Sequence, residues 1–323
     1  MIEISVGIDI GGTNTLIGLV NRKGESLIET NISTNKHEDI NLYFAEIADE
    51  INKAMDVLGE GYHIVGIGIG APNGNYYTGT IEYAPNLNWR GVVNVVDLMK
   101  KYINTPVILT NDANAAALGE MIYGGAKGMK NFIVITLGTG LGSGLVVNGD
   151  VVYGHDGFAG ELGHTIVNYN GRQCACGLQG CMETYVSATG LKRTYLEMLA
   201  YFPFRGALSN VAPDDLTAKA ISEAAIAGDK VAIATFEYTG KILGQKIAEA
   251  TAYTSPEAVF LFGGLAQAGN LIFEPTQKYM EEYMLNIYKD KVKLLPSSVD
   301  GANAAVLGAS ALVWKELEFP RKR

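Results

Sequence analysis

The 323-residue chain lacks the features that would place it in a membrane or outside the cell. No apolar stretch approaches the ~20 residues that a membrane-spanning helix needs. Residues 1–5 lack the basic region and the long apolar segment of a signal peptide. We therefore expect a cytoplasmic protein without a membrane partner, in which the three cysteines do not form a disulfide framework.

Positive charge is also scarce, because 25 lysines and arginines face 34 aspartates and glutamates. The formal net charge of −9 argues against a general nucleic-acid surface, which needs clustered lysine and arginine. The only basic run is residues 320–323, which we interpret as a solvated tail. We therefore expect no nucleic-acid partner.

Glycine is abundant instead, with 39 residues in 323 against a usual share of about 7%. The glycines gather in short clusters at the ends of apolar runs, a pattern typical of tight turns around phosphate groups. The turns that we assign to a nucleotide contain Asp9, Gly11, Gly12, Thr13, Asn14, Thr139, Gly140, Gly263 and Gly264. Each turn alone could be an ordinary hairpin, but three glycine turns at three strand ends favour a nucleotide between two domains.

The three turns have different expected contacts. Backbone N–H groups of the first two turns, with the side chains of Thr13 and Asn14, would donate to phosphate oxygens. Asp9 would hold Mg²⁺ through water, because this ion keeps much of its hydration shell. Adenine and ribose would lie against the backbone of Gly263 and Gly264. No Walker A pattern is present, and a strand rather than a helix is expected after the second turn, which argues against a Rossmann motif.

Strands that alternate with helices predict an α/β sheet with mixed pairing. Strands are expected over residues 4–10, 15–20, 26–32, 64–69, 107–110 and 258–262. Helices are expected over residues 40–58, 93–102, 217–227, 229–253 and 303–317, from about residue 113, and after residue 267. The segment between residues 74 and 93 is assigned as an irregular loop, and residues 196–213 as a loop or short helices.

The chain repeats one pattern at a distance. Residues 8–13 and then 18–20 resemble residues 135–140 and then 144–146. Two strand-turn-strand units at this separation predict two related domains that face one another across a cleft. Chance similarity between glycine-rich hairpins is the alternative.

All three cysteines and one histidine fall in a single short segment. His164, Cys174, Cys176 and Cys181 would form a Cys₃His set, and thiolates and imidazole are the preferred ligands of zinc. Four protein ligands indicate a closed, structural site rather than one that activates water. The alternative is three free, partly buried thiols.

A carboxylate stands where a predicted strand meets a helix. Asn111 and Asp112 follow the strand over residues 107–110, at the edge where ligands bind in open α/β sheets. A helix N-cap is the alternative, because asparagine and aspartate are common caps. Glu161 and Glu183 lie on either side of the zinc segment, and ordinary surface positions are the alternative for both.

Together these motifs resemble those of the ROK family of sugar kinases, repressors and open reading frames. The resemblance rests on residues 9–13, 111–114 and 160–164, and on the pattern Cys174-x-Cys-Gly-x-x-Gly-Cys-x-Glu183, which is highly specific to that family. It runs in order from residue 4 to about residue 310. It implies the α/β actin-like ATPase (ribonuclease H-like) fold, with two domains flanking a cleft, and a homodimer or tetramer. We expect residues 1–114 with 303–323 to form a small domain, and residues 115–302 to form a large domain with the zinc site and the dimer surface.

The resemblance also implies roles for the site residues. Asp112 would be the catalytic base, taking the proton from the sugar hydroxyl that attacks the γ-phosphate of ATP. His164 would serve twice, with one ring nitrogen on zinc and the other on the sugar. The loop over residues 71–75 departs from the commoner Pro-Gly version of this family. The sugar would be bound by Asn111, Asp112, Glu161, His164 and Glu183, with Asn73 and Asn86 also in reach.

We expect ATP-dependent phosphorylation of glucose at its 6-hydroxyl, as in glycolysis. Glu161 with His164 suits a gluco-configured sugar, although fructose, mannose, allose and N-acetylhexosamines share most of these contacts. Repressors of the family carry a helix-turn-helix ahead of the first glycine motif, and we expect no room for one before Asp9. A non-catalytic sugar sensor is a further alternative, and Asp112 argues against it because a sensor needs no base.

Overall fold

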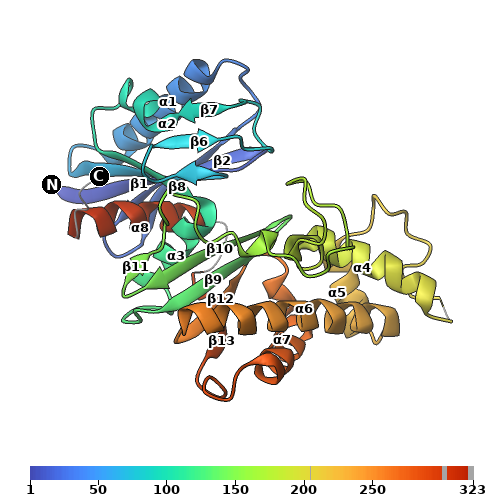
Figure 1. The fold of residues 1–323 in the computed structure, drawn as a ribbon. Helices are drawn as coiled ribbons and strands as arrows, with labels where there is room; N and C mark the ends of the chain where they lie inside the picture. Colours follow the sequence, from blue (N-terminus) through green and yellow to red (C-terminus); the bar gives the residue numbers. More distant parts are fainter. Residues whose placement is uncertain (204, 300–303, 319–323) are drawn as a thin grey trace.

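Two five-stranded mixed sheets form the framework of the protein (Figure 1). The computed structural model describes residues 1–203, 205–299 and 304–318. The first sheet has the order β3-β2-β1-β4-β8, with β1 (Ile2–Ile10), β2 (Asn14–Asn21), β3 (Ser26–Ser33), β4 (Tyr62–Ala71) and β8 (Val107–Asn111). The second has the order β11-β10-β9-β12-β13, with β9 (Phe132–Leu137), β10 (Leu141–Val147), β11 (Asp150–Val151), β12 (Ala258–Phe262) and β13 (Lys293–Pro296).

The two sheets share one topology. In each, three strands that follow one another along the chain pair as antiparallel neighbours. The two remaining strands then extend the sheet in parallel from the first of those three. The turns β1–β2 and β9–β10 therefore occupy equivalent places, which confirms that the repeated sequence pattern marks two related units.

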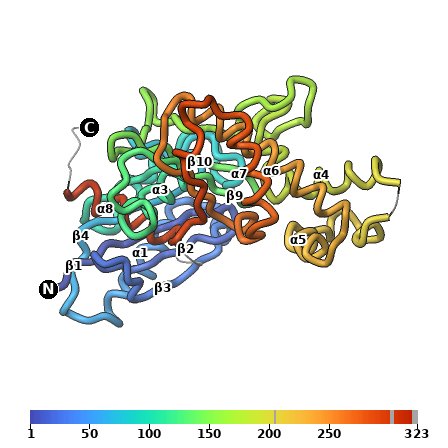
Figure 2. Tube along the Cα trace, turned by 90° about the horizontal axis from the view of Figure 1, so that it is seen from below, coloured from blue at the N-terminus to red at the C-terminus, as the bar shows by residue number. Residues whose placement is uncertain are grey.

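Helices cover these sheets with apolar faces. In α1 (Ile40–Leu58), Phe44, Ile47 and Ile51 recur at helical spacing and are fully buried in the core of the first sheet. Asp39 caps this helix by accepting a hydrogen bond from the backbone N–H of Asn41. The core of the second sheet is shared by four helices, α4 (Ala188–Tyr201), α5 (Ala218–Ile226), α6 (Lys230–Thr254) and α7 (Asn270–Tyr283). Of these, α4 and α5 lie at the opposite end of the molecule from the N-terminus (Figures 1 and 2).

Two further helices lie between the sheets (Figure 1). The first, α3 (Asp112–Ile122), contacts β9 and β10, and the second, α8 (Ala304–Glu318), contacts β1, β4 and α3. Their approach requires glycine. A Cβ at Gly68 would lie 1.9 Å from the carbonyl oxygen of Ala309, and one at Gly308 would lie 2.5 Å from that of Ala115. The last helix of the chain is therefore packed directly on the backbone of the first sheet.

The structure differs from the predicted elements in several places. The segment predicted as an irregular loop holds a small sheet, formed by β5 (Gly74–Asn75), β6 (Thr80–Glu82) and β7 (Val92–Asn94). Consequently α2 (Val95–Lys100) begins later than predicted. Residues 196–201 continue α4, so for them the helical alternative holds and not the loop, and β13 was not predicted.

Two predictions concern residues that the structure does not describe. The solvated tail over residues 320–323 and residue 303 of the last predicted helix both lie outside the described residues. Within the described ranges, no helix combines the length and the apolar character that crossing a membrane requires.

Candidate functional site

The first two residues of β10 adjoin two of the predicted site residues. The backbone N–H of Leu141 donates a hydrogen bond to Glu183 Oε2 at 2.9 Å. A Cβ at Gly142 would lie 3.9 Å from Asp112 Oδ1. The start of this strand therefore brings the Glu183 carboxylate and the Asp112 carboxylate to one place.

The third residue of β10, Ser143, adds the Glu161 segment. Its hydroxyl donates to the carbonyl oxygen of Gly160 and accepts from the backbone N–H of Leu162 at 3.2 Å. The chain on both sides of Glu161 is thus tied to β10. Sequence reasoning missed Ser143, although it is the only polar side chain in a strand otherwise built of glycine and aliphatic residues.

Asp112 is the first residue of α3, and the residue before it caps the helix. Asn111 Oδ1 accepts hydrogen bonds from the backbone N–H groups of Ala113 and Asn114, at 2.8 and 3.4 Å. The N-cap is therefore Asn111. The same backbone N–H of Ala113 also donates to Asp112 Oδ1, at 2.7 Å. Solvent reaches the Asp112 side chain, but the protein encloses its carboxylate closely enough that burial raises its pKa above the ordinary value.

Asp9, near the end of β1, lies beside Asp112. A Cβ at Gly70 would lie 3.8 Å from Asp9 Oδ1 and 3.7 Å from the Cα of Asp112. Burial, and then the negative charge of Asp112, raise the pKa of Asp9 from 3.8 to about 7. Two carboxylates held this closely repel one another, so the arrangement favours a cation or a hydrogen-bond donor near them.

The first glycine turn follows directly on Asp9. The backbone N–H of Gly11 donates to the carbonyl oxygen of Asn14 at 3.0 Å, which closes the turn. The side chains of Thr13 and Asn14 are exposed, as donors to a ligand would need to be. A Cβ at Gly12 would lie 2.9 Å from the carbonyl oxygen of Asn86, so the chain around Asn86 borders this turn.

The second and third glycine turns are neighbours at the ends of β9 and β12. The backbone N–H of Gly138 donates to the carbonyl oxygen of Gly140 at 3.0 Å, and Thr139 between them is exposed. Gly263 has a φ of +98°, and a Cβ there would lie 2.7 Å from a backbone oxygen of β9. A Cβ at Gly264 would meet nothing beyond its chain neighbours within 4 Å. The backbone at Gly264 is therefore open to a ligand.

Four side chains converge as the predicted zinc ligands. The ligand atoms of His164, Cys174, Cys176 and Cys181 all lie within 4.8 Å of one another. Cys176 Sγ and Cys181 Sγ are 3.6 Å apart, and Cys174 Sγ is 3.8 Å from His164 Nδ1. Bond lengths of about 2.3 Å to sulfur and 2.0–2.1 Å to nitrogen in a tetrahedral zinc site imply ligand separations of roughly 3.5–3.8 Å. The set therefore fits a structural zinc ion.

His164 connects the zinc cluster with the carboxylates. Its Nδ1 faces Cys174, and its Nε2 lies 4.0 Å from Glu161 Oε2. Glu161 directly precedes the short 3₁₀ helix η1 (Leu162–His164), and His164 is its last residue. Burial raises the pKa of Glu161; the charge of His164 opposes this shift, and the charges of Asp112 and Glu183 add to it. Every predicted sugar-binding carboxylate thus influences another.

Asn73 has a local partner in the structure. Its Nδ2 donates to the carbonyl oxygen of Glu82 at 2.9 Å, and its φ is +52°. Asparagine tolerates this left-handed conformation better than most residues, which explains how it replaces the glycine of the commoner loop. Contact of Asn73 with a sugar stays a prediction.

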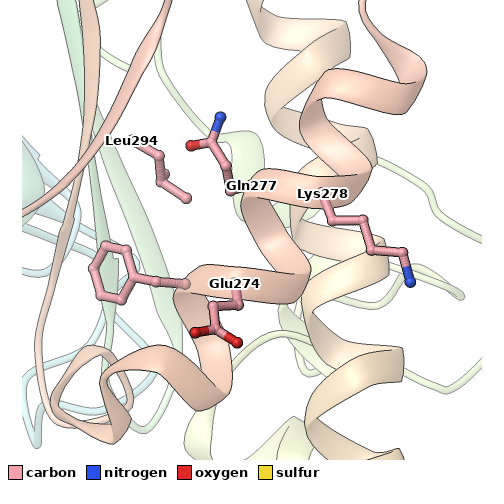
Figure 3. A pocket seen from close by; sticks show the side chains of 5 residues that line it. Glu274, Gln277, Lys278 and Leu294 are labelled. Carbon is pink, nitrogen blue, oxygen red and sulfur yellow. The ribbon is translucent and has the colours of Figure 1, made fainter.

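A cavity of about 480 Å³ lies elsewhere, between α7 and β13 (Figure 3). None of the residues that line it belongs to the predicted site. They are Phe273, Glu274, Gln277, Lys278 and Leu294.

The zinc cluster makes a direct prediction. Cys176 is exposed, so Cys176→Ser removes one ligand with little change in packing. We expect zinc content to fall from one ion per chain to nearly none, with a loss of stability of ~3 kcal/mol if the metal is present at 100 times its dissociation constant. Metal analysis and urea unfolding measure both. As a control, a chelator should destabilise the wild type and leave Cys176→Ser unaffected; a variant that keeps its zinc contradicts the assignment.

Asp9 predicts how stability depends on pH. Between about pH 4 and 7, Asp9 keeps its proton in the folded protein, whereas the same side chain has already lost it in the unfolded chain. The free energy of unfolding therefore falls as pH rises through this range. Asp9→Asn should remove about 1 kcal/mol of the decline between pH 6 and 8. Urea unfolding without nucleotide or Mg²⁺ tests this, with Glu3→Gln on the surface as the control. An unchanged pH difference in Asp9→Asn would rule out the shift.

Comparison with known proteins shows the family of the chain. The sequence pattern of the ROK family matches residues 5–316. A glucokinase from Halalkalibacterium halodurans is 36% identical over 319 residues, which are 96% of this chain and 95% of that protein. A xylose repressor from Caldicellulosiruptor bescii is 30% identical over 98% of this chain and 79% of its own length.

A solved structure is similar over nearly the whole chain. It is a ROK family glucokinase from Streptomyces griseus in complex with glucose and AMPPNP, with a TM-score of 0.79 and 31% identity, covering 97% of this chain and 99% of that one. The two topologically equivalent sheets, with helices between them, are therefore the predicted actin-like ATPase fold. With 312 consecutive residues matched by the family pattern, this chain belongs to the ROK family.

Proposed function

We propose that the protein is an ATP-dependent kinase that phosphorylates glucose at its 6-hydroxyl. The observation that carries the proposal is the position of Asp112, beside Asp9 of the first sheet and beside the β10 strand that also holds Glu183. Glucokinases are among the relatives with the highest identity, and the similar solved enzyme binds glucose and AMPPNP.

Asp112 would act as the base. Phosphoryl transfer depends mainly on positioning and on charge stabilisation, so the task of this carboxylate is to orient the sugar hydroxyl and accept its proton. Its raised pKa brings the group closer to neutral pH, where proton acceptance is more efficient than for an ordinary carboxylate. Asn111 and the N–H of Ala113 fix it at the start of α3.

The sugar would be bound by the side chains gathered around β10. Carboxylates accept hydrogen bonds from sugar hydroxyls, and Glu161 and Glu183 supply them at two places on the ring. His164 would present Nε2 to the sugar while Nδ1 is held by the metal cluster, so the metal fixes the orientation of the imidazole. Asn111 and Asn86 would complete the set.

ATP would lie between the three glycine turns. The exposed Thr13, Asn14 and Thr139 would donate to its phosphates, and the open backbone at Gly264 would receive the adenosine. Mg²⁺ would enter with ATP, held through water by Asp9, and would supply positive charge at the phosphates.

The family resemblance also supports a proposal about location, assembly and domain division. We propose a cytoplasmic homodimer or tetramer that feeds glycolysis, with residues 1–114 and 303–323 as the small domain and 115–302 as the large one. Packing of α8 on β1 and β4 supports this division for the described part of the C-terminal segment. Light scattering tests the assembly.

A hexose panel tests the function. With each sugar at millimolar concentration, we expect the fastest ADP release with glucose. Mannose, fructose, allose and N-acetylhexosamines should be turned over more slowly. A different preferred hexose would replace glucose in the proposal. No turnover on any sugar would instead indicate a non-catalytic sensor and would overturn the kinase proposal.

Asp112→Asn tests the base. The amide keeps the shape but cannot accept the proton, so we expect kcat to fall 10²–10⁴-fold while the dissociation constant for glucose changes only a few-fold. Steady-state kinetics and calorimetry measure the two. The control is Asp56→Asn on the exposed face of α1, which should behave as the wild type. A variant with more than a tenth of wild-type activity would mean that another group is the base.

A further inference from the structure

Arg172, two residues before Cys174 of the predicted zinc ligands, uses all five of its guanidinium N–H donors. Its Nε and Nη2 bind the two carboxylate oxygens of Glu197 at 2.9 and 2.6 Å. Nη2 also donates to Thr194 Oγ1 at 2.9 Å, and Nη1 donates to the carbonyl oxygens of Thr184 and Gly190 at 2.6 and 3.2 Å. Only 10% of the side chain is exposed, so this is a fully satisfied, buried cation.

These bonds connect three parts of the chain. Thr184 is the last residue of the 3₁₀ helix η2 (Met182–Thr184), which carries Glu183, whereas Thr194 and Glu197 lie on α4. The guanidinium carbon also lies 4.3 Å from the centre of the Tyr185 ring, in cation–π geometry. Arg172 therefore fixes η2 against the first turns of α4.

The backbone of Arg172 adds the metal hairpin, residues 168–181, to this unit. Its carbonyl oxygen accepts from the N–H of Gly180 at 2.8 Å, next to the ligand Cys181. Its own N–H donates to the Tyr185 hydroxyl at 3.1 Å. The hairpin is thus attached to the protein at two places, the metal cluster at one and Arg172 at the other.

Glu183 lies between two fixed points as a result. On one side its carboxylate accepts from Leu141 at the start of β10. On the other side, the carbonyl oxygen of the next residue, Thr184, accepts the 2.6 Å hydrogen bond from Arg172. A shift of η2 would move the Glu183 carboxylate relative to the other groups around β10.

We propose that Arg172 is a positioning residue for sugar recognition, which holds Glu183 and the metal hairpin in one rigid unit independently of the metal. This inference rests on the proposed function, because it assigns Glu183 to the sugar. Lysine cannot replace the arginine, since a single ammonium has three donors and no planar fork for a carboxylate.

Arg172→Lys tests the proposal, since it keeps the charge and removes the fork. We expect the dissociation constant for glucose, measured by calorimetry without nucleotide, and the KM for glucose to rise at least 10-fold. The KM for ATP should stay within about 3-fold, and metal analysis should still find one zinc per chain. A merely structural arginine would not separate the two substrates in this way.

The matched control is Arg193→Lys on α4. Arg193 is exposed and donates one hydrogen bond of 3.3 Å to the Gln173 carbonyl oxygen, so we expect no change in the affinity for either substrate. Should Arg172→Lys fail to fold, Glu197→Gln and Thr194→Val remove one partner each and should raise the glucose dissociation constant 3- to 10-fold.

Three results would overturn the proposal. They are a glucose affinity within 2-fold of the wild type, an equal loss for glucose and ATP, and loss of the zinc together with the affinity, which would mean action through the metal. A wild type that prefers another hexose corrects only the glucose assignment, and the same comparison with that hexose then decides the role of Arg172. A wild type that binds no sugar overturns both.

Discussion

The packing of α8 onto bare backbone is the constraint on which the site depends. Gly68 of β4 leaves room for the carbonyl oxygen of Ala309, and Gly308 lets α8 reach the backbone of α3 at Ala115. Side chains at these glycines would separate the first sheet from α3 by the width of a methyl group or more. Because Asp112 begins α3 and Asp9 lies near the end of β1, this close contact sets the distance between the two carboxylates. The packing of the sheet against the helices therefore also determines the arrangement of the site carboxylates.

The carboxylates gathered by this packing do not stabilise the protein. Burial raises the pKa values of Asp9, Asp112 and Glu161, and neighbouring negative charge adds to the shift at Asp9 and Glu161, so the charged form of each is less favourable than in water. Such destabilised groups cluster at functional sites, where a ligand supplies the missing charge or donors. Here a cation at Asp9 and hydroxyls at Glu161 would relieve the repulsion, so binding and the favourable protonation state reinforce one another.

What the sequence predicted follows from local chemistry. Glycine turns, the Asn111–Asp112 junction and the cysteine spacing are short patterns whose geometry is set by a few neighbours. The structure places Asp112 beside Asp9 and brings the four candidate metal ligands together, while the binding roles of these residues stay predictions. The β5–β7 sheet was missed because strands of two or three residues have no measurable period. Ser143 and Arg172 were missed for another reason. Their partners lie 13 to 25 positions away or are backbone atoms, and no spacing rule marks such contacts.

The exposure of the metal hairpin explains what a structural ion would contribute beside this site. Most of its residues are exposed, and even apolar ones such as Tyr169 and Leu178 are 87% and 52% accessible, so burial cannot hold its shape. Cross-links must do so instead, and both candidates, metal coordination by the Cys₃His set and the arginine fork, are directional. A zinc ion at the Cys₃His set would fix where the imidazole of His164 points, and the arginine fork fixes where η2 lies. A hydrophobic core would give stability without that directional control, and distinguishing similar hexoses depends on the placement of single carboxylate and imidazole groups.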